Sequence, residues 1–508
     1  MNPLSVVTER AVEPVIPTLS DRLRKPFESV LMGESLKSKV FRGGAWLGTG
    51  SVSEQVIRFG RNMILTRLMA PEAFGTMAIV LSASSVVQTI MDVGVKEALI
   101  QNPRGNEDEY VGAAWWMAFG RAVAFWALLS LFAPLIARFY GDHLLSPLLR
   151  ICAIGVLFDG AISSRAYLAI KNMKFRNWAV INHGGAIAGV FVTVALSFLL
   201  RNVWALVIGY GAESIGRFTL SYVVCPCLPP RRLPLAAIRD LLRFSKKAFG
   251  LSLLNLIFAR TDIFVLAKIV GPAELGLYTM AIYLVQTPTT FLMNLLGQTM
   301  LPTFSCVQDD RSRTSRIFSQ VTSVLVIVGI PAIFFIVFCG QSLLGLVYGP
   351  RYSAAAGPLM IASFVALLNL LNGQITSIFY AKGMPQLHRR CVVIMAITML
   401  GLIYPLVLRF GLVGGQLAAL LAILVGFSFQ LRRVRAMAEL DVCHYGKLFL
   451  VSTVVCMAIT AIYAVAQKFT FVAQPVPKIL FGVAGCILAY CVSGRMFLRG
   501  LTEVAGLD

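Results

Sequence analysis

The side chains of this 508-residue chain that could do chemistry are charged residues that interrupt long apolar stretches. Ten lie well inside such stretches, eight of them before residue 220: Glu54, Arg58, Arg61, Arg121, Asp159, Arg165, Glu213, Arg217, Arg260 and Asp262. A charge in an apolar environment is costly, so each residue is a candidate for function. Six of the ten are arginines, whose planar guanidinium stays charged when desolvated and holds phosphate oxygens with paired hydrogen bonds.

Helical spacing indicates which of these side chains could act together. Arg58 and Arg61 are three residues apart and share a helix face, and Glu54 precedes Arg58 by one turn. Glu213 and Arg217 are also one turn apart. Such groups either line a cationic cavity that receives a diphosphate headgroup or form ion pairs that make burial tolerable. For the last pair both interpretations stay open.

Three arginines have fewer acids nearby, and for these we favour the phosphate-binding cavity: Arg58, Arg61 and Arg260. The other three arginines are expected to contribute to the same cavity: Arg121, Arg165 and Arg217. Because most of these residues precede residue 220, the first half of the chain should form most of the cavity wall.

Four carboxylates could instead bind a coupling cation, H+ or Na+: Glu54, Asp159, Glu213 and Asp262. Asp262 follows Arg260 by two residues, so on a helix the two side chains point about 200° apart and need not neutralise each other. Asp92, which is followed by Gly94, is expected only to cap a helix end.

Motifs for catalysis and for metal binding are missing from the sequence. It contains no GxxxxGK[ST] phosphate loop, no GxSxG elbow and no HExxH. The four histidines fall in four different segments, and the ten cysteines are scattered, so we expect no metal, no other cofactor and free packing thiols. We therefore predict that the protein is not an enzyme.

The composition indicates a membrane protein with many helical spans. Apolar and aromatic residues make up 57% of the chain and charged residues only 14%, with a mean hydropathy of +0.77. A soluble chain of this length would need more charge to cover its surface, because about 25% is ordinary. We predict fourteen transmembrane helices, at 43–66, 73–95, 112–137, 148–170, 178–200, 203–224, 247–268, 273–300, 317–340, 356–380, 390–409, 411–431, 447–467 and 478–498.

Basic residues fix the expected orientation of these spans. The net charge is +21, but Lys and Arg sit between apolar runs, which argues against a nucleic-acid partner. With the amino terminus in the cytoplasm, thirty Lys and Arg fall in inner segments and eight in outer loops, so both termini should be cytoplasmic. Residues 1–42 lack the apolar core of a cleaved signal and form either a short interfacial helix or a basic tail.

A repeat divides the chain into two halves. The segment Leu68–Gly75 (LMAPEAFG) is echoed by Ile269–Gly276 (IVGPAELG) at an offset of 201 residues. Six spans separate the copies, which predicts two parallel six-helix lobes. The predicted divisions are a basic segment 1–42, an N-lobe 43–224, a cytoplasmic linker 225–246, a C-lobe 247–431, and two further helices with a short tail at 432–508.

With these motifs the chain resembles the polysaccharide transporter family of the multidrug/oligosaccharidyl-lipid/polysaccharide (MOP) flippase superfamily. The motifs that carry the resemblance are Gly44-Ala45-Trp46, Ile64–Leu68, Pro71–Gly75, Asp92–Gly94, Phe244-Ser245, Arg260–Asp262, Gly271–Tyr278 and Leu301–Phe304. The resemblance implies transfer of undecaprenyl-pyrophosphate-linked oligosaccharide across the bacterial cytoplasmic membrane, for exopolysaccharide, capsule or O-antigen synthesis. It also implies work alongside a polysaccharide polymerase and chain-length or export proteins.

Three alternatives stay open. A membrane-embedded polysaccharide polymerase or ligase would need an external catalytic surface, whereas every predicted outer loop has about fifteen residues or fewer. A multidrug transporter of the same superfamily usually has twelve spans rather than fourteen. A lipid II flippase fits the span number equally well, and only the motifs argue against it.

The predicted orientation can be tested with reporter fusions. A reporter fused after Arg433 should give a cytoplasmic signal and one fused after Arg201 an external signal, because the basic loops are retained inside. Paired alkaline phosphatase and green fluorescent protein fusions at both positions measure this. The opposite signal at both positions would reverse the orientation.

Overall fold

The structure is a computed structural model of the chain. It describes 36–91, 94–227, 233–245, 249–438, four positions between 450 and 457, and 475–505. The predicted interfacial segment within 1–42 therefore lies almost wholly outside the described residues, as do Asp92 and nearly all of the predicted span 447–467.

The described residues form helices and contain no strand, which confirms the all-α fold class. The helices are α2 (Leu36–Leu68), α3 (Pro71–Met91), α4 (Val95–Gln101), α5 (Asp108–Tyr140), α6 (Leu145–Gly160), α7 (Arg165–Lys171), α8 (Phe175–Leu200), α9 (Val203–Val224), α10 (Leu235–Ser245), α11 (Phe249–Ile269), α12 (Pro272–Cys306), α13 (Arg311–Val347), α14 (Ala356–Ala381), α15 (Pro385–Phe410), α16 (Leu412–Ala438) and α18 (Pro475–Ala505), with 3-10 turns η1 (Pro103–Asn106) and η2 (Pro350–Ala355).

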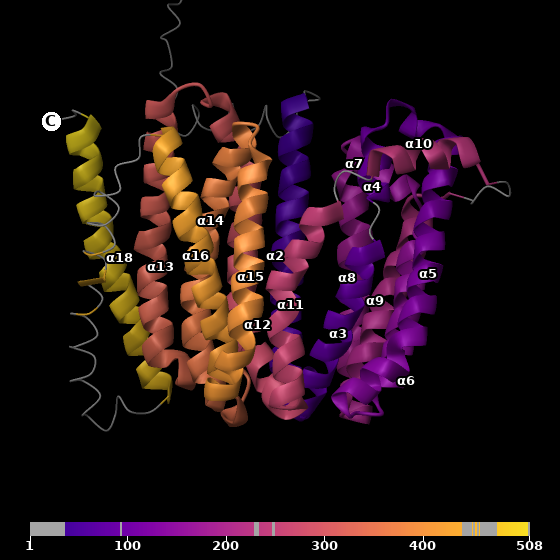
Figure 1. The fold of residues 1–508 in the computed structure, drawn as a ribbon, viewed down its shortest axis with the longest axis horizontal. Helices are drawn as coiled ribbons and strands as arrows, with labels where there is room; N and C mark the ends of the chain where they lie inside the picture. The colour runs from indigo at the N-terminus through magenta and orange to yellow at the C-terminus, as the bar shows by residue number, and fades with distance from the viewer. Residues whose placement is uncertain are drawn as a thin grey trace, which may run out of the picture.

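Twelve of the fourteen predicted spans each coincide with one of these helices, and a thirteenth, 148–170, falls on the pair α6 and α7. Within the described part of the chain, seven helices are long and apolar enough to cross a membrane by strict length and composition, or eight with the bent pair α6 and α7. The remaining long helices, such as α2 and α11, run parallel to them through the same thickness (Figure 1). The chain is therefore a multi-pass membrane protein.

One predicted span, 148–170, is broken rather than continuous. Between α6 and α7 the chain bends by 60°. A bend exposes backbone groups that need partners inside a membrane. The carbonyl of Ala161 accepts hydrogen bonds from Tyr222 and Trp115, and the N–H of Ser163 donates to the hydroxyl of Ser221 at 3.0 Å. Side chains of α9 and α5 thus supply hydrogen-bond partners for the backbone groups exposed at the break. Hydropathy alone does not reveal this break.

The helices form two groups with two helices between them (Figure 1). The segment α3–α9 lies on one side, and α12–α16 with α18 lies on the other. The first helix of each predicted lobe, α2 and α11, stands between the groups. The start of α2 and the end of α18 lie at the same edge of the molecule, as an even number of spans requires. This edge is called the α10 end below.

Helix α10 lies within the predicted linker and was missed from the sequence, where the segment was treated as a basic connection. It lies across the tops of the N-lobe helices (Figure 1). Ala237 and Leu241 are buried against α4 and α5, and the Tyr110 hydroxyl donates to Asp240 at 3.0 Å. The four-residue spacing of Ala237 and Leu241 is the sequence pattern from which this helix could have been predicted.

The two copies of the repeat meet at the end opposite α10. A Cβ atom on Gly75 would lie 1.8 Å from the carbonyl oxygen of Pro272, and a Cβ atom on Gly276 would lie 1.8 Å from the carbonyl oxygen of Pro71. Only glycine permits so close an approach of two backbones. Because each copy contacts the other through equivalent residues, α3 and α12 are related by an approximate two-fold axis, as two parallel lobes require.

A second reciprocal contact joins the lobes at the same end. Arg67, in the last turn of α2, donates to the carbonyl of Leu346 at 3.0 Å, in the last turn of α13. Lys268, in the last turn of α11, donates to the carbonyl of Phe139, in the last turn of α5. Each bond places a cation at the negative end of a helix in the other lobe. These contacts and the glycine pair are called the closing contacts.

The glycine contact generates a stability prediction. Gly75→Ala and Gly276→Ala should each lower the free energy of unfolding by about 1–3 kcal/mol, because the added methyl group meets a backbone carbonyl that cannot rotate away. Gly297→Ala, on α12 in open space, is the matched control and should leave stability unchanged or slightly raised. Thermal unfolding of detergent-purified protein measures all three. Equal unfolding temperatures for the Gly75 and Gly297 variants would contradict the close contact.

Candidate functional site

The central charged residues of the N-lobe form a connected network. The Arg58 guanidinium on α2 contacts Glu54 one turn earlier at 2.8 Å and Glu213 on α9 at 2.6 Å. His183 on α8 contacts the other oxygen of Glu54 at 2.7 Å. One arginine and its partners thus join α2 to the consecutive helices α8 and α9, which lie far from α2 in sequence.

The network continues to a fourth helix. Arg217 contacts Glu213 on its own helix at 3.5 Å and Asp159 on α6 at 3.0 Å. Ser214 also donates to Asp159, at 3.0 Å. The charge network, as we call it, comprises His183, Glu54, Arg58, Glu213, Arg217 and Asp159.

Glycines bring α8 and α9 close enough to place the acid and the arginine of α9. A Cβ atom on Gly185 would lie 2.8 Å from the backbone nitrogen of Arg217, and one on Gly189 would lie 3.0 Å from the Cα of Glu213. On α2, a Cβ atom on Gly50 would meet the ring of His183. Small residues at helix crossings are typical of membrane interfaces, where close backbone packing replaces the hydrophobic effect.

The network is less cationic than we predicted for this cavity. It holds three carboxylates and two arginines, and its side chains are 10–27% exposed. Arg58 and Arg217 are both committed to carboxylates, since an arginine without a counter-charge would be costly at this depth. For Glu213 and Arg217, the intrahelical pair that we considered is present, and each member also has a partner on another helix.

Two of the arginines that we favoured from the sequence lie outside these ion pairs. Arg61, one turn after Arg58, donates two hydrogen bonds to the side-chain oxygen of Asn62, at 3.2 and 3.1 Å. Arg260 is half-buried on α11. Among the residues that the structure describes, neither guanidinium has a carboxylate within ion-pair distance. Their charges are therefore the ones best able to receive an anion.

Arg165 is not part of this site. It lies at the α10 end, 48% exposed, and contacts Asp108 at 2.9 Å and the carbonyl of Pro226 at 3.2 Å. Near it, hydrogen bonds from Arg104 hold the pKa of the Glu107 carboxyl below its usual range. The acidic run at 107–109 thus pairs locally with basic residues, as expected of a solvated loop.

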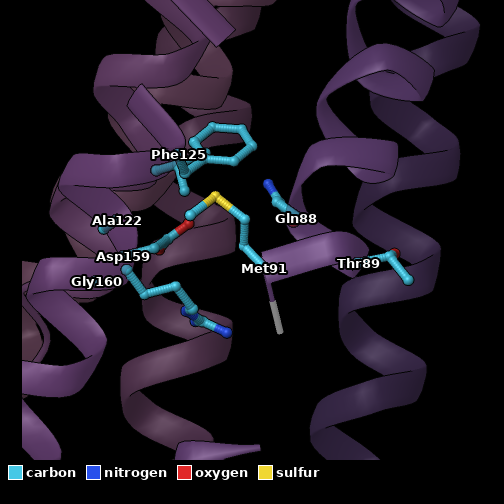
Figure 2. Close-up of a pocket in the computed structure, with 9 residues that line it drawn as sticks. Gln88, Thr89, Met91, Ala122, Phe125, Asp159 and Gly160 are labelled. Carbon is cyan, nitrogen blue, oxygen red and sulfur yellow. The ribbon is translucent and has the colours of Figure 1, made fainter. Parts of the chain in front are cut away.

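A cavity of about 310 Å³ adjoins the network. It lies between α3, α5 and α6, and Asp159 belongs to both the cavity wall and the network (Figure 2). The lining residues are Gln88, Thr89, Met91, Arg121, Ala122, Phe125, Val156, Asp159 and Gly160. The structure therefore places the predicted Arg121 in the wall of this cavity.

The predicted carboxylate of the C-lobe has a different setting. Asp262 on α11 accepts a hydrogen bond from the Tyr278 hydroxyl at 2.6 Å, and that hydroxyl in turn accepts one from the Gln416 amide at 2.7 Å. The backbone N–H of Ile263 also donates to Asp262. The direct partners of Asp262 are therefore neutral donors, one from α12 and one from α11 itself. The sequence did not single out Tyr278, Gln416 or His183 as site residues, although Tyr278 belongs to a family motif.

The comparisons with known proteins agree with this architecture. Duplicated helical lobes of this kind are typical of membrane transporters. The chain belongs to the family described as polysaccharide biosynthesis protein, which matches residues 64–357, more than half of the sequence.

Individual proteins are similar to the chain over most of its length. It is 22% identical to the lipopolysaccharide biosynthesis protein WzxC of Escherichia coli (strain K12), over 77% of this chain and 78% of that one. It is 24% identical to the succinoglycan biosynthesis transport protein ExoT of Rhizobium meliloti (strain 1021), over 68% and 70%. The lipid II flippase MurJ, in an inward closed conformation, shares the fold with a TM-score of 0.75 at 15% identity, over 89% of this chain and 98% of that one.

These findings confirm the predicted polysaccharide transporter family and the MOP flippase fold. The relatives are transport and biosynthesis proteins of polysaccharides. The roles of individual residues rest on the geometry above, and the lobe boundaries stay as predicted from the sequence.

Proposed function

We propose that the protein moves a lipid-linked oligosaccharide, carried on undecaprenyl pyrophosphate, from the inner to the outer leaflet of the bacterial cytoplasmic membrane. Family membership supports a role in polysaccharide transport. The observation that carries the proposal is that Arg61 on α2 and Arg260 on α11, the two helices between the helix groups, have no carboxylate partner among the described residues. A pyrophosphate is the part of such a substrate that needs cationic partners inside a membrane.

In this proposal the headgroup first meets Arg61 and Arg260 and then competes for the paired arginine. Arg58 has two carboxylate partners, and phosphate oxygens match its planar fork as well as carboxylate oxygens do. A pyrophosphate that displaces Glu54 or Glu213 satisfies the arginine again. Before substrate binds, the network thus keeps the charge of Arg58 paired with carboxylates. After one carboxylate is displaced, Arg58 can bind a phosphate instead.

Displacement of a carboxylate supplies a reason for ion coupling. A buried carboxylate that loses its arginine partner is stabilised by taking up a proton or Na+. Glu54 and Glu213 are the acids that lose Arg58, so substrate entry and cation uptake are linked, whereas Asp159 keeps its contact with Arg217. Asp262 keeps its hydrogen bonds from Tyr278 and Ile263 and is a separate candidate for the coupling cation.

Alternating access follows from the closing contacts. With both termini in the cytoplasm, as we propose from the basic loops, the closing contacts lie at the outer end. The lobes then meet outside, and an outward-facing state requires Gly75 to part from Pro272 and Arg67 from Leu346. Rocking of two lobes about a central site accomplishes this without unfolding a helix.

The headgroup assignment predicts a loss of export. Arg61→Ala and Arg260→Ala should each reduce export at least about tenfold, because hydrogen bonds to a charged group are lost, and Lys should restore it only in part. Polysaccharide yield in a strain of the source bacterium that lacks the chromosomal copy measures export, and immunoblots of membranes check the protein level. Arg58→Ala should also reduce export, but it removes the shared arginine partner of Glu54 and Glu213 as well.

Arg165→Ala is the matched control, since this arginine lies outside the network, and it should export normally. Normal export by the Arg58, Arg61 and Arg260 alanine variants together would exclude the proposed headgroup site.

The closing contacts predict a reversible block. A cysteine pair at Ala73 and Glu274, introduced where α3 and α12 meet in a background without the native cysteines, should trap the lobes closed at the outer end once oxidised. Lipid-linked sugar should then accumulate in the inner leaflet, and reduction should restore export. The two single-cysteine variants are the controls and should export under both conditions. Efficient crosslinking with undiminished export would show that the rocking mechanism is wrong.

A further inference from the structure

We infer that the cavity between α3, α5 and α6 is a binding site for the first sugar of the oligosaccharide, a neutral sugar that carries free hydroxyl groups. This inference rests on the proposed function, because it assigns the part of the substrate next to the pyrophosphate. The family relationship and the charge network by themselves say nothing about where the sugar lies.

The size of the cavity suits one small group. Its volume of about 310 Å³ is at the lower end of the range for ligand pockets, roughly 300–1,000 Å³. A whole repeat unit of several sugars exceeds this space, whereas a sugar at the reducing end can enter it. The remaining sugars then extend toward the space between the lobes.

The lining combines the two kinds of surface that a sugar presents. Gln88, Thr89 and Asp159 offer an amide, a hydroxyl and a carboxylate to sugar hydroxyls. Phe125 and Met91 offer apolar walls to the C–H faces of the ring. Figure 2 shows the side chains of Met91 and Asp159 extending into the same space, with Gln88 and the Phe125 ring beside them.

Asp159 supplies a specific reason to expect a hydroxyl donor. One carboxylate oxygen accepts hydrogen bonds from Arg217 and Ser214, both at 3.0 Å. The other oxygen is buried and has no hydrogen-bond partner among the described residues. A buried acceptor without a partner is costly, and a sugar hydroxyl in the cavity satisfies it once the Asp159 carboxylate turns slightly toward the cavity. Arg121 also lines the cavity, so its wall carries one cationic and one anionic side chain and suits a sugar without a net charge.

The shared residue also fixes the order of groups along the substrate. Asp159 lines the cavity and contacts Arg217, which belongs to the charge network. A pyrophosphate that reaches Arg58 in the network has the cavity on the side of Arg217 and Asp159, where its directly attached sugar can lie. The lipid tail must leave on the side away from α5 and α6.

The experiment compares two affinities in the purified full-length protein. Isothermal titration measures the binding of farnesyl pyrophosphate and of farnesyl pyrophosphate that carries one glucose, one galactose or one N-acetylglucosamine. At least one sugar-bearing probe should bind about fivefold or more tightly than the bare probe, since a few hydrogen bonds are added. This ratio reports on the cavity, whereas the affinity for the bare probe reports on the headgroup site.

Two variants act on the cavity alone. Gln88→Ala removes a polar partner and Met91→Trp fills space, and both should reduce the ratio to near one while the affinity for the bare probe stays within about twofold. Met384→Trp, at a position 42% exposed in a distant turn, is the matched control and should keep the wild-type ratio.

An affinity ratio near one for all three sugars in the wild-type protein would overturn the inference. An unchanged affinity ratio in both cavity variants would also overturn it. Either result leaves the headgroup site standing if the bare probe binds. Failure of every probe to bind would overturn the proposed headgroup site and the sugar site with it.

Discussion

The arrangement of the N-lobe depends on how one buried guanidinium is neutralised. Arg58 lies between Glu54 and Glu213, and in an apolar interior an unmatched member of this trio would be strongly destabilising. The contact of Arg58 with Glu213 connects α2 to α9. The contact of His183 with Glu54 connects α2 to α8 as well. Close glycine packing of α8 against α9 is required because the acid must reach the arginine. Electrostatic neutrality thus sets the helix positions.

The fold is symmetric in its backbone and asymmetric in its chemistry. Both lobes contribute equivalent residues to the closing contacts, Gly75 with Gly276 and Arg67 with Lys268. The described ion pairs of the interior, however, belong to the N-lobe, whereas Asp262 in the C-lobe has neutral partners. A pseudo-symmetric frame can rock evenly while its charged site stays on one side. Substrate binding and cation binding can therefore occupy different lobes.

Hydropathy predicted the spans and self-comparison predicted the lobe relation, because both depend on local sequence. The partners of the central arginine could not be predicted, since Arg58 and Glu213 are 155 residues apart and no spacing rule connects them. For the same reason the break after α6 was missed, as it is stabilised by Tyr222 on another helix. Of the three arginines that the sequence marked as having few nearby acids, Arg61 and Arg260 lie outside the described ion pairs, whereas Arg58 has two carboxylate partners. Arg165, which we expected to contribute to the same cavity, instead makes a solvent-exposed contact with Asp108.

The reciprocal glycine contact has the form of an isologous interface, in which the same patch on two subunits meets itself. An ancestral six-helix protein could have formed this contact as a homodimer, across a true two-fold axis, before its two copies were joined in one polypeptide. Fusion removes the need for both copies to carry the same site. One half can then carry the arginines and acids of a binding centre while the other does not, because the contact itself needs only Pro71, Gly75 and their counterparts.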